Sequence, residues 1–308
     1  MNSKTINYAV IFITGAITLS VELLSSRILK PFFGESLLIW SGILSVTLTG
    51  LAIGYYIGGY VTKKYKRLGL IYYTIPSIAG IWLTIINLFY PKFFWILAKT
   101  NITVGAYIAC ATMLFIPLVA LSAMNPILVA LLRIEDKSTK RGDGGAGAVF
   151  FISTIGSVTG VLITAFIFIP NISNYNSVLI LSFLLLVISG LYYLKKKGNK
   201  LILVLIFLVI ILQTYVLFFG YNNHLKGITV KQGEMEWTVQ EVYQSFYGSI
   251  KIIKIYNKKS KANFKLFLQE GVAQSIVDSE DLSVTGFIYV LEALASGFTE
   301  KNSSILCL

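Results

Sequence analysis

A single acidic residue interrupts the first apolar stretch of the chain. Glu22 lies within residues 8–29, and Ser25, Ser26 and Arg27 follow it closely. A carboxylate inside a membrane is costly, so it normally faces the interior of a helix bundle or a polar cavity. Two roles therefore remain open. Glu22 binds a cationic substrate, or it anchors the bundle by pairing with Arg27 or with a basic residue of another helix.

Asn125 is the second polar residue that could contribute to a site inside an apolar stretch, here residues 104–132. It directly precedes Pro126, and Pro117 lies earlier in the same stretch. Proline removes a backbone hydrogen-bond donor and kinks a helix. The amide of Asn125 therefore either caps backbone groups freed near Pro126 or contributes to a polar site. The stretch exceeds the length of one crossing, so we expect it to be bent or partly re-entrant.

Small residues recur at four-residue spacing in two apolar stretches. Gly50, Gly54 and Gly58 share one helical face in the second stretch, and Gly156 and Gly160 do so in the fifth. Such spacing lets helix backbones approach closely in lipid. We predict packing between helices of one chain, with a dimer face or a substrate groove as alternatives.

Residues for metal or thiol chemistry are scarce. Cys110 and Cys307 form no disulfide framework, and His224 is the only histidine. Zinc sites draw several ligands from Cys, His and acidic side chains, so we expect no metal cofactor. The glycine-rich segment 142–147 follows no predicted strand, which favours a linker over a phosphate-binding loop.

The elements that carry these residues are mostly membrane helices. Hydrophobic residues make up 56% of the chain, and the mean hydropathy of +0.75 is typical of an integral membrane protein. Crossing a bilayer takes about 20 apolar residues. Seven stretches are long enough: residues 8–29, 37–61, 70–90, 104–132, 148–169, 177–194 and 201–219. We predict an α-helical multi-pass bundle of about seven helices in the cell membrane, surrounded by lipid.

Charge is distributed unevenly along the chain. The net charge of +12 resides in residues 1–220, whereas acidic and basic residues balance in 221–308. Lys4 and the basic clusters at 63–67, 133–141 and 195–200 fall on one side of a seven-crossing topology. The positive-inside rule makes that side cytoplasmic and places the C-terminal module outside. A basic excess in membrane loops sets topology, so we expect no nucleic-acid partner.

The sequence pattern changes after residue 220. Residues 239–255 alternate, a lysine-rich turn follows at 257–261, and residues 264–268 and 271–275 continue the pattern. These are signals of β-hairpins in a small antiparallel sheet. Residues 282–295 then predict a helix, with 279–281 at its N-terminus, and 303–308 predict a buried strand. The predicted domains are therefore a membrane bundle (1–220), a β-rich module (221–281) and the start of a further domain (282–308).

Several segments resemble spermidine-synthase-type aminopropyltransferases. YQSFYGSIKII (243–253) resembles the opening strand of that family, LFLQEGVAQS (266–275) resembles its hairpin, and DSED (278–281) resembles the acidic stretch after it. Three membrane segments are similar to fused, membrane-bound members of the family. They are ELLSSRILKPFFG (22–34), GYYIGG (54–59) and AGAVFFISTIGS (146–157).

The resemblance implies a fold, a reaction and a set of site residues. The terminal strand would open a Rossmann-like α/β domain that is truncated in this chain. The reaction would transfer an aminopropyl or other S-adenosyl-derived group to a polyamine, with decarboxylated S-adenosylmethionine or S-adenosylmethionine as co-substrate. Gln274 takes the place of a glutamine that contacts this donor, and Asp278 and Glu280 correspond to the following acidic pair. A purely structural role for Gln274 in the hairpin remains the alternative.

The chain also departs from the family pattern. Gly248 stands where soluble members have a second glutamine, Gln269 replaces the hairpin aspartate, and the catalytic aspartate is expected beyond Leu308. A general base must free the lone pair of the amine before it attacks. We therefore expect this chain to be inactive by itself, with a partner chain supplying the Rossmann-like domain. A homo-oligomer is left open.

A second functional class remains open beside the transferase. The chain would be a membrane carrier or scaffold for a polyamine or an S-adenosyl compound. Glu22 would hold the cation, and the β-module would serve as a docking platform.

Overall fold

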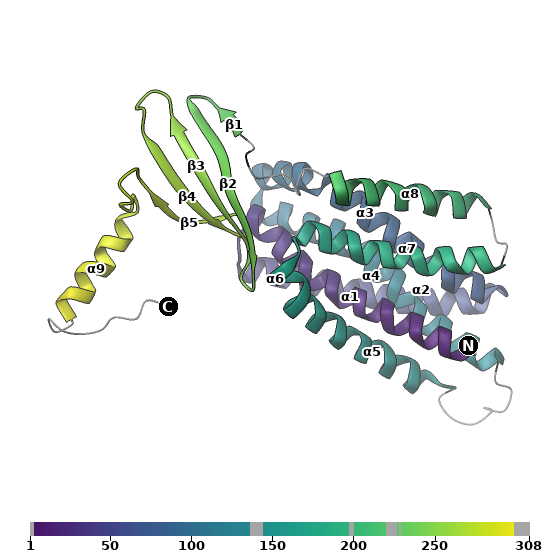
Figure 1. The fold of residues 1–308 in the computed structure, drawn as a ribbon. Coiled ribbons are helices and arrows are strands. Elements are labelled where there is room, and N and C mark those ends of the chain that lie inside the picture. Colours follow the sequence, from purple (N-terminus) through teal and green to yellow (C-terminus); the bar gives the residue numbers. More distant parts are fainter. Residues whose placement is uncertain (1–2, 136–143, 197–199, 220–226, 228, 299–308) are drawn as a thin grey trace. The chain divides into compact units, whose positions relative to one another are not determined.

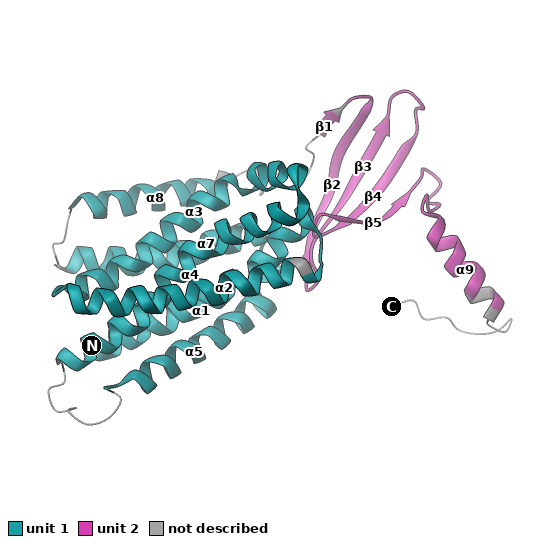
Figure 2. Cartoon of the chain, turned by 180° about the vertical axis from the view of Figure 1, so that it is seen from behind, with its two compact units in different colours: residues 1–223 teal, residues 224–308 magenta. Residues whose placement is uncertain are grey.

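A computed structural model describes residues 3–135, 144–196, 200–219, 227 and 229–298. The chain divides into two compact units, Met1–Asn223 and His224–Leu308 (Figure 2). The first is a bundle of long helices, and the second contains a β-sheet and one helix (Figure 1).

Seven helices of the first unit are long and apolar enough to cross a membrane, counted over the described residues. They are α1 (Ser3–Phe33), α2 (Leu37–Lys64), α3 (Leu68–Thr100), α4 (Ile102–Glu135), α5 (Ala146–Ile163), α7 (Asn174–Lys196) and α8 (Lys200–Phe219). The fifth span continues past α5 through the π-helical η1 (Thr164–Phe168) and the short α6 (Ile169–Asn171). The predicted bundle of about seven long apolar helices is confirmed, and each helix contains the core of its predicted stretch.

The fourth span is one continuous helix. α4 runs through both Pro117 and Pro126, so the alternative of a partly re-entrant segment was wrong. α3 likewise continues through Pro76 and Pro91. Proline is tolerated in membrane helices because neighbouring helices and local backbone adjustments satisfy the groups that it frees. A single crossing keeps the number of spans at seven.

Glycines bring pairs of helices into close backbone contact. A Cβ atom on Gly156 or Gly160 of α5 would overlap the carbonyl oxygens of Phe12 or Ala16 on α1. Gly54 on α2 lies equally close to α4, and Gly58 does so one turn later. The prediction of packing within one chain is confirmed for both glycine series, because the partners are α1 and α4 of the same bundle.

The second unit contains a five-stranded antiparallel sheet in the order β1-β2-β3-β4-β5. Its strands are β1 (Thr229–Gln232), β2 (Met235–Ser245), β3 (Gly248–Asn257), β4 (Asn263–Gln269) and β5 (Val272–Val277). The alternating segment 239–255 proves to be a hairpin of β2 and β3. The sequence did not reveal β1, a four-residue strand with three polar or charged positions.

The helix after the sheet begins later than predicted. α9 spans Gly286–Phe298, not 282–295, and residues 279–281 form a turn before it. The turn forms because one carboxylate oxygen of Asp278 accepts hydrogen bonds from the backbone N–H groups of Glu280 (2.9 Å) and Leu282 (3.0 Å). The predicted strand 303–308 lies outside the described residues, so the Rossmann-like start remains a prediction.

Candidate functional site

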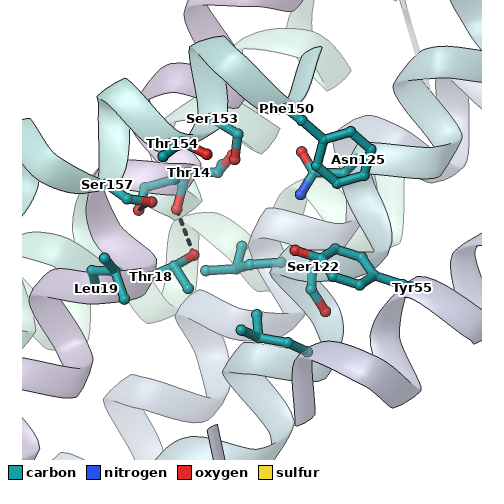
Figure 3. A pocket seen from close by; sticks show the side chains of 13 residues that line it. Thr14, Thr18, Leu19, Tyr55, Ser122, Asn125, Phe150, Ser153, Thr154 and Ser157 are labelled. Atoms are coloured by element: carbon teal, nitrogen blue, oxygen red, sulfur yellow. Dashed lines mark hydrogen bonds between the residues drawn. The ribbon is translucent and has the colours of Figure 1, made fainter. Parts of the chain in front are cut away.

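A cavity lined by both polar and apolar side chains lies between α1, α2, α4 and α5 (Figure 3). Its volume is about 200 Å³, many times the ~10–15 Å³ that one water molecule needs. It is lined by Thr14, Gly15, Thr18, Leu19, Leu51, Tyr55, Leu121, Ser122, Asn125, Phe150, Ser153, Thr154 and Ser157. Because lipid offers no hydrogen bonds, this group of polar side chains marks a part of the bundle suited to a polar ligand.

The hydroxyl groups of the cavity present mainly acceptor lone pairs. Four of them share one feature, which is that each donates its hydrogen to a backbone carbonyl. The pairs are Thr14 to Ile11 (3.2 Å), Thr18 to Thr14 (2.7 Å), Ser122 to Val119 (3.4 Å) and Ser157 to Gly15 (3.0 Å). A hydroxyl has a single hydrogen to donate, so what these four can still offer a ligand is acceptance.

Asn125 contributes a further acceptor. Its side chain is buried, with 5% of its surface exposed, and its Oδ1 atom has no hydrogen-bond partner among the described residues. The amide group lies beside the hydroxyl of Tyr55, as Figure 3 shows. A buried carbonyl without a partner costs free energy unless a ligand or water supplies a donor. The structure thus places this predicted residue at the cavity wall.

Glu22 lies one helical turn beyond Thr18 on the same face of α1. It is partly buried and faces the hydroxyl of Thr47 on α2. Thr47 is itself buried, with 5% of its surface exposed. Thr14, Thr18 and Glu22 therefore form a polar stripe that leads away from the cavity. Arg27 lies five residues after Glu22, which turns it by about 140° around α1.

No family model, curated protein or solved structure matches this chain.

The chemistry of the site therefore follows from its own side chains. Acceptor oxygens on three helices and a carboxylate one turn away suit a small ligand that carries hydrogen-bond donors and positive charge. The described residues contain no group of three or more His, Cys, Asp or Glu side chains that could hold a metal ion.

The predicted donor-binding residue of the sheet occupies an irregular position. The register between β4 and β5 shifts at Phe267 and Leu268, and Gln274 is left without a cross-strand partner. Its side chain is exposed. Such β-bulges re-aim a side chain and are common beside functional sites.

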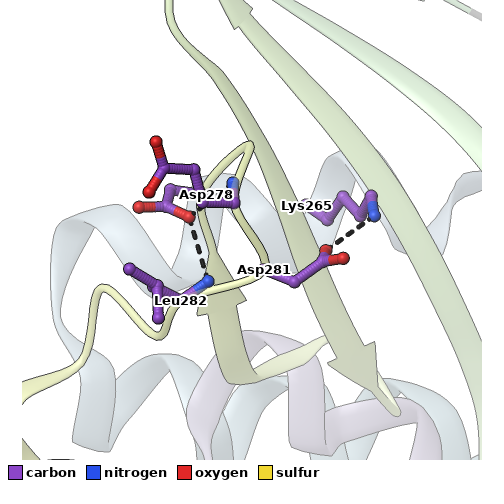
Figure 4. A network of polar contacts seen from close by, with 5 residues as sticks. Lys265, Asp278, Asp281 and Leu282 are labelled. Carbon is purple, nitrogen blue, oxygen red and sulfur yellow. Dashed lines mark hydrogen bonds and ion pairs between the residues drawn. The ribbon is translucent and has the colours of Figure 1, made fainter.

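The two acidic residues predicted for the site, Asp278 and Glu280, have different surroundings. Asp278 holds the turn after β5 through its carboxylate, and Asp281 pairs with Lys265 on β4 at 2.8 Å (Figure 4). Glu280 is exposed at the tip of this turn. Within the described residues, no side-chain hydrogen bond joins Gln274 to either acid. The structure therefore gives Asp278 a structural role and leaves Gln274 and Glu280 accessible.

Charged groups elsewhere in the sheet have shifted pKa values. Burial lowers the pKa of Lys251 on β3, and the nearby Glu270 carboxylate partly opposes the shift. Hydrogen bonding to Lys258, 3.1 Å away, lowers the pKa of Glu236. Residues of the second unit itself therefore account for both shifts.

Sequence reasoning missed most of the cavity wall. Tyr55, Phe150 and the threonines of α1 are ordinary residues in a membrane helix, and their convergence depends on packing. Gln213 was also missed, although it is the one amide in the most apolar span. Its Nε2 atom donates to Thr84 (2.5 Å) and Ser182 (2.6 Å), which ties α8 to α3 and α7.

Proposed function

We propose that this chain is a membrane-embedded, spermidine-synthase-like protein. It would transfer an aminopropyl or other S-adenosyl-derived group to an amine. The observation that carries the proposal is the position of Gln274, which lies exposed at a bulge of β5 and is the side chain that the resemblance assigns to the donor. The order of sheet followed by helix supports it.

The proposed reaction needs groups beyond those described here. Transfer requires a base that frees the lone pair of the amine, and neither Glu280 nor Gln274 stands near a described amine site. We propose that a Rossmann-like domain, in the same protein or in a partner, supplies this base and holds decarboxylated S-adenosylmethionine or S-adenosylmethionine. The basic loops would be cytoplasmic and the β-module outside.

Replacing Gln274 with alanine tests the donor-site assignment. We expect kcat/KM for aminopropyl transfer to putrescine by the natively expressed protein to fall about tenfold or more, because a hydrogen bond to a charged donor is worth roughly 1.5–3 kcal/mol. Gln240→Ala is the matched control, since Gln240 is exposed at the other bulge of the sheet, between Val239 and Glu241. Equal effects of both changes would contradict the assignment, and robust turnover by the 308-residue chain alone would contradict the need for a further domain.

A second candidate is a carrier of polyamines or S-adenosyl compounds. The specific observation in its favour is the acceptor-lined cavity, with Glu22 one turn away. Glu22→Gln keeps the shape of the side chain and removes its charge. A carrier should then lose most putrescine uptake into proteoliposomes, whereas a structural anchor should lose thermal stability and keep the uptake rate per folded molecule.

A further inference from the structure

We propose that the cavity between α1, α2, α4 and α5 binds one ammonium group of an aliphatic diamine, and that Glu22 binds the other. This site rests on the proposed function, which requires an amine substrate. It would hold the amine whether that amine is the acceptor of a transfer reaction or the cargo of a carrier.

Hydrogen-bond complementarity selects an ammonium group for the cavity. The hydroxyls of Thr14, Thr18, Ser122 and Ser157 spend their hydrogens on backbone carbonyls and can only accept. Asn125 Oδ1 is buried and lacks a donor. An alkylammonium carries three donors and no acceptor, so it matches this surface. A carboxylate or phosphate would find no donor at these five oxygens.

An aromatic pair adds a second feature that suits a cation. The rings of Tyr55 on α2 and Phe150 on α5 both line the cavity, and their centroids lie 5.8 Å apart at 75°. An ammonium above an aromatic face gains roughly 0.5–2 kcal/mol, more when it is removed from water. The cavity lining contains neither lysine nor arginine that could fill this role from the protein itself.

Glu22 and Thr47 define the second end of the site. Residues 14, 18 and 22 follow one face of α1, and residues 55, 51 and 47 follow the facing side of α2 in the opposite direction. Thr18 and Glu22 are separated by about 6 Å along the helix axis. An extended short diamine spans such a step. The Thr47 hydroxyl beside Glu22 supplies a further oxygen for the second ammonium.

A direct binding measurement on the full chain in lipid nanodiscs tests the proposal without any donor or transport assay. The probes are putrescine, butylamine, 1,4-butanediol and sodium chloride, titrated by calorimetry. We expect putrescine to bind most tightly, butylamine more weakly, and the diol not at all. Glu22→Gln should weaken the binding of putrescine about tenfold or more and change the affinity for butylamine by less than about twofold, because only the diamine reaches Glu22.

Variants of Asn125 test the cavity end. Asn125→Leu should weaken both amines about tenfold or more, and Asn125→Asp, which keeps the acceptor, should bind them at least as tightly as the native chain. Thr214→Val is the control, because Thr214 is exposed on α8 and its hydroxyl donates to the carbonyl of Ile210 in its own helix. Absence of putrescine binding, unchanged binding in Asn125→Leu, or sodium binding that replaces amine binding would each overturn the proposal. Loss of transfer with intact amine binding would overturn the proposed reaction instead.

Discussion

Gly160→Ala is expected to destabilise the helix bundle by about 3 kcal/mol, the upper end of the cost of overpacking a well-packed core. The added Cβ atom would overlap the carbonyl oxygen and Cα atom of Ala16 on α1. Both are backbone atoms, so no side chain can turn aside to make room. Relief requires α1 and α5 to separate, which also disturbs the Ser157–Gly15 hydrogen bond one turn away. The measurement is the thermal unfolding midpoint of purified protein in detergent.

Gly59→Ala is the matched control for this change. Gly59 is also a helical glycine in a membrane span, but no atom of another helix lies within 4 Å of the position its Cβ would take. Both substitutions gain the same helix propensity of about 1 kcal/mol. The difference between the two unfolding midpoints therefore measures helix–helix contact alone. Equal midpoints would contradict the close approach of α1 and α5.

The membrane part of the fold could be predicted because lipid imposes simple rules. A span needs a long apolar run and internally satisfied backbone groups, and both can be recognised without knowing the partners. The glycine spacing predicted close packing for the same reason. It could not name the partner helices, since α2 packs on α4 and α5 packs on α1, neither of which is adjacent in sequence. Proline misled the reading of α4 because its cost depends on neighbours that the sequence does not show.

From the sequence, only those polar residues of the cavity and its surroundings that are energetically costly in lipid could be recognised. Glu22 and Asn125 stand out because ionisable and amide groups are rare in membrane spans. Thr14 and Thr18 do not stand out, because hydroxyls routinely bond to their own helix. These hydroxyls could form a binding site only because the packing of the helices brings them to one cavity. In the sheet, the bulge that exposes Gln274 likewise depends on the register between β4 and β5.

The presence of Gly248, which stands where soluble members of the resembling family have a glutamine, has a local physical cause. Gly248 opens β3 with φ of +97°, a conformation that side chains rarely adopt. The Glu270 side chain packs against it and accepts a hydrogen bond from the Ser249 N–H at 2.7 Å. Glu270 is itself buried, at 6% exposure. Both the positive φ of this position and the Glu270 carboxylate would exclude a glutamine at position 248.

Gly248→Ala should therefore destabilise the sheet by about 3 kcal/mol or more. The left-handed backbone costs roughly 1–2 kcal/mol for a side chain, and loss of a hydrogen bond to a charged group costs roughly 1.5–3 kcal/mol. Gly233→Ala is the control, because Gly233 also has positive φ (+60°) but meets no atom within 4 Å. Hydrogen exchange of β3 and β4 amides in the full chain should accelerate far more for Gly248→Ala than for Gly233→Ala. Equal acceleration would mean that backbone strain alone sets the cost, and that Glu270 does not hold this end of the sheet.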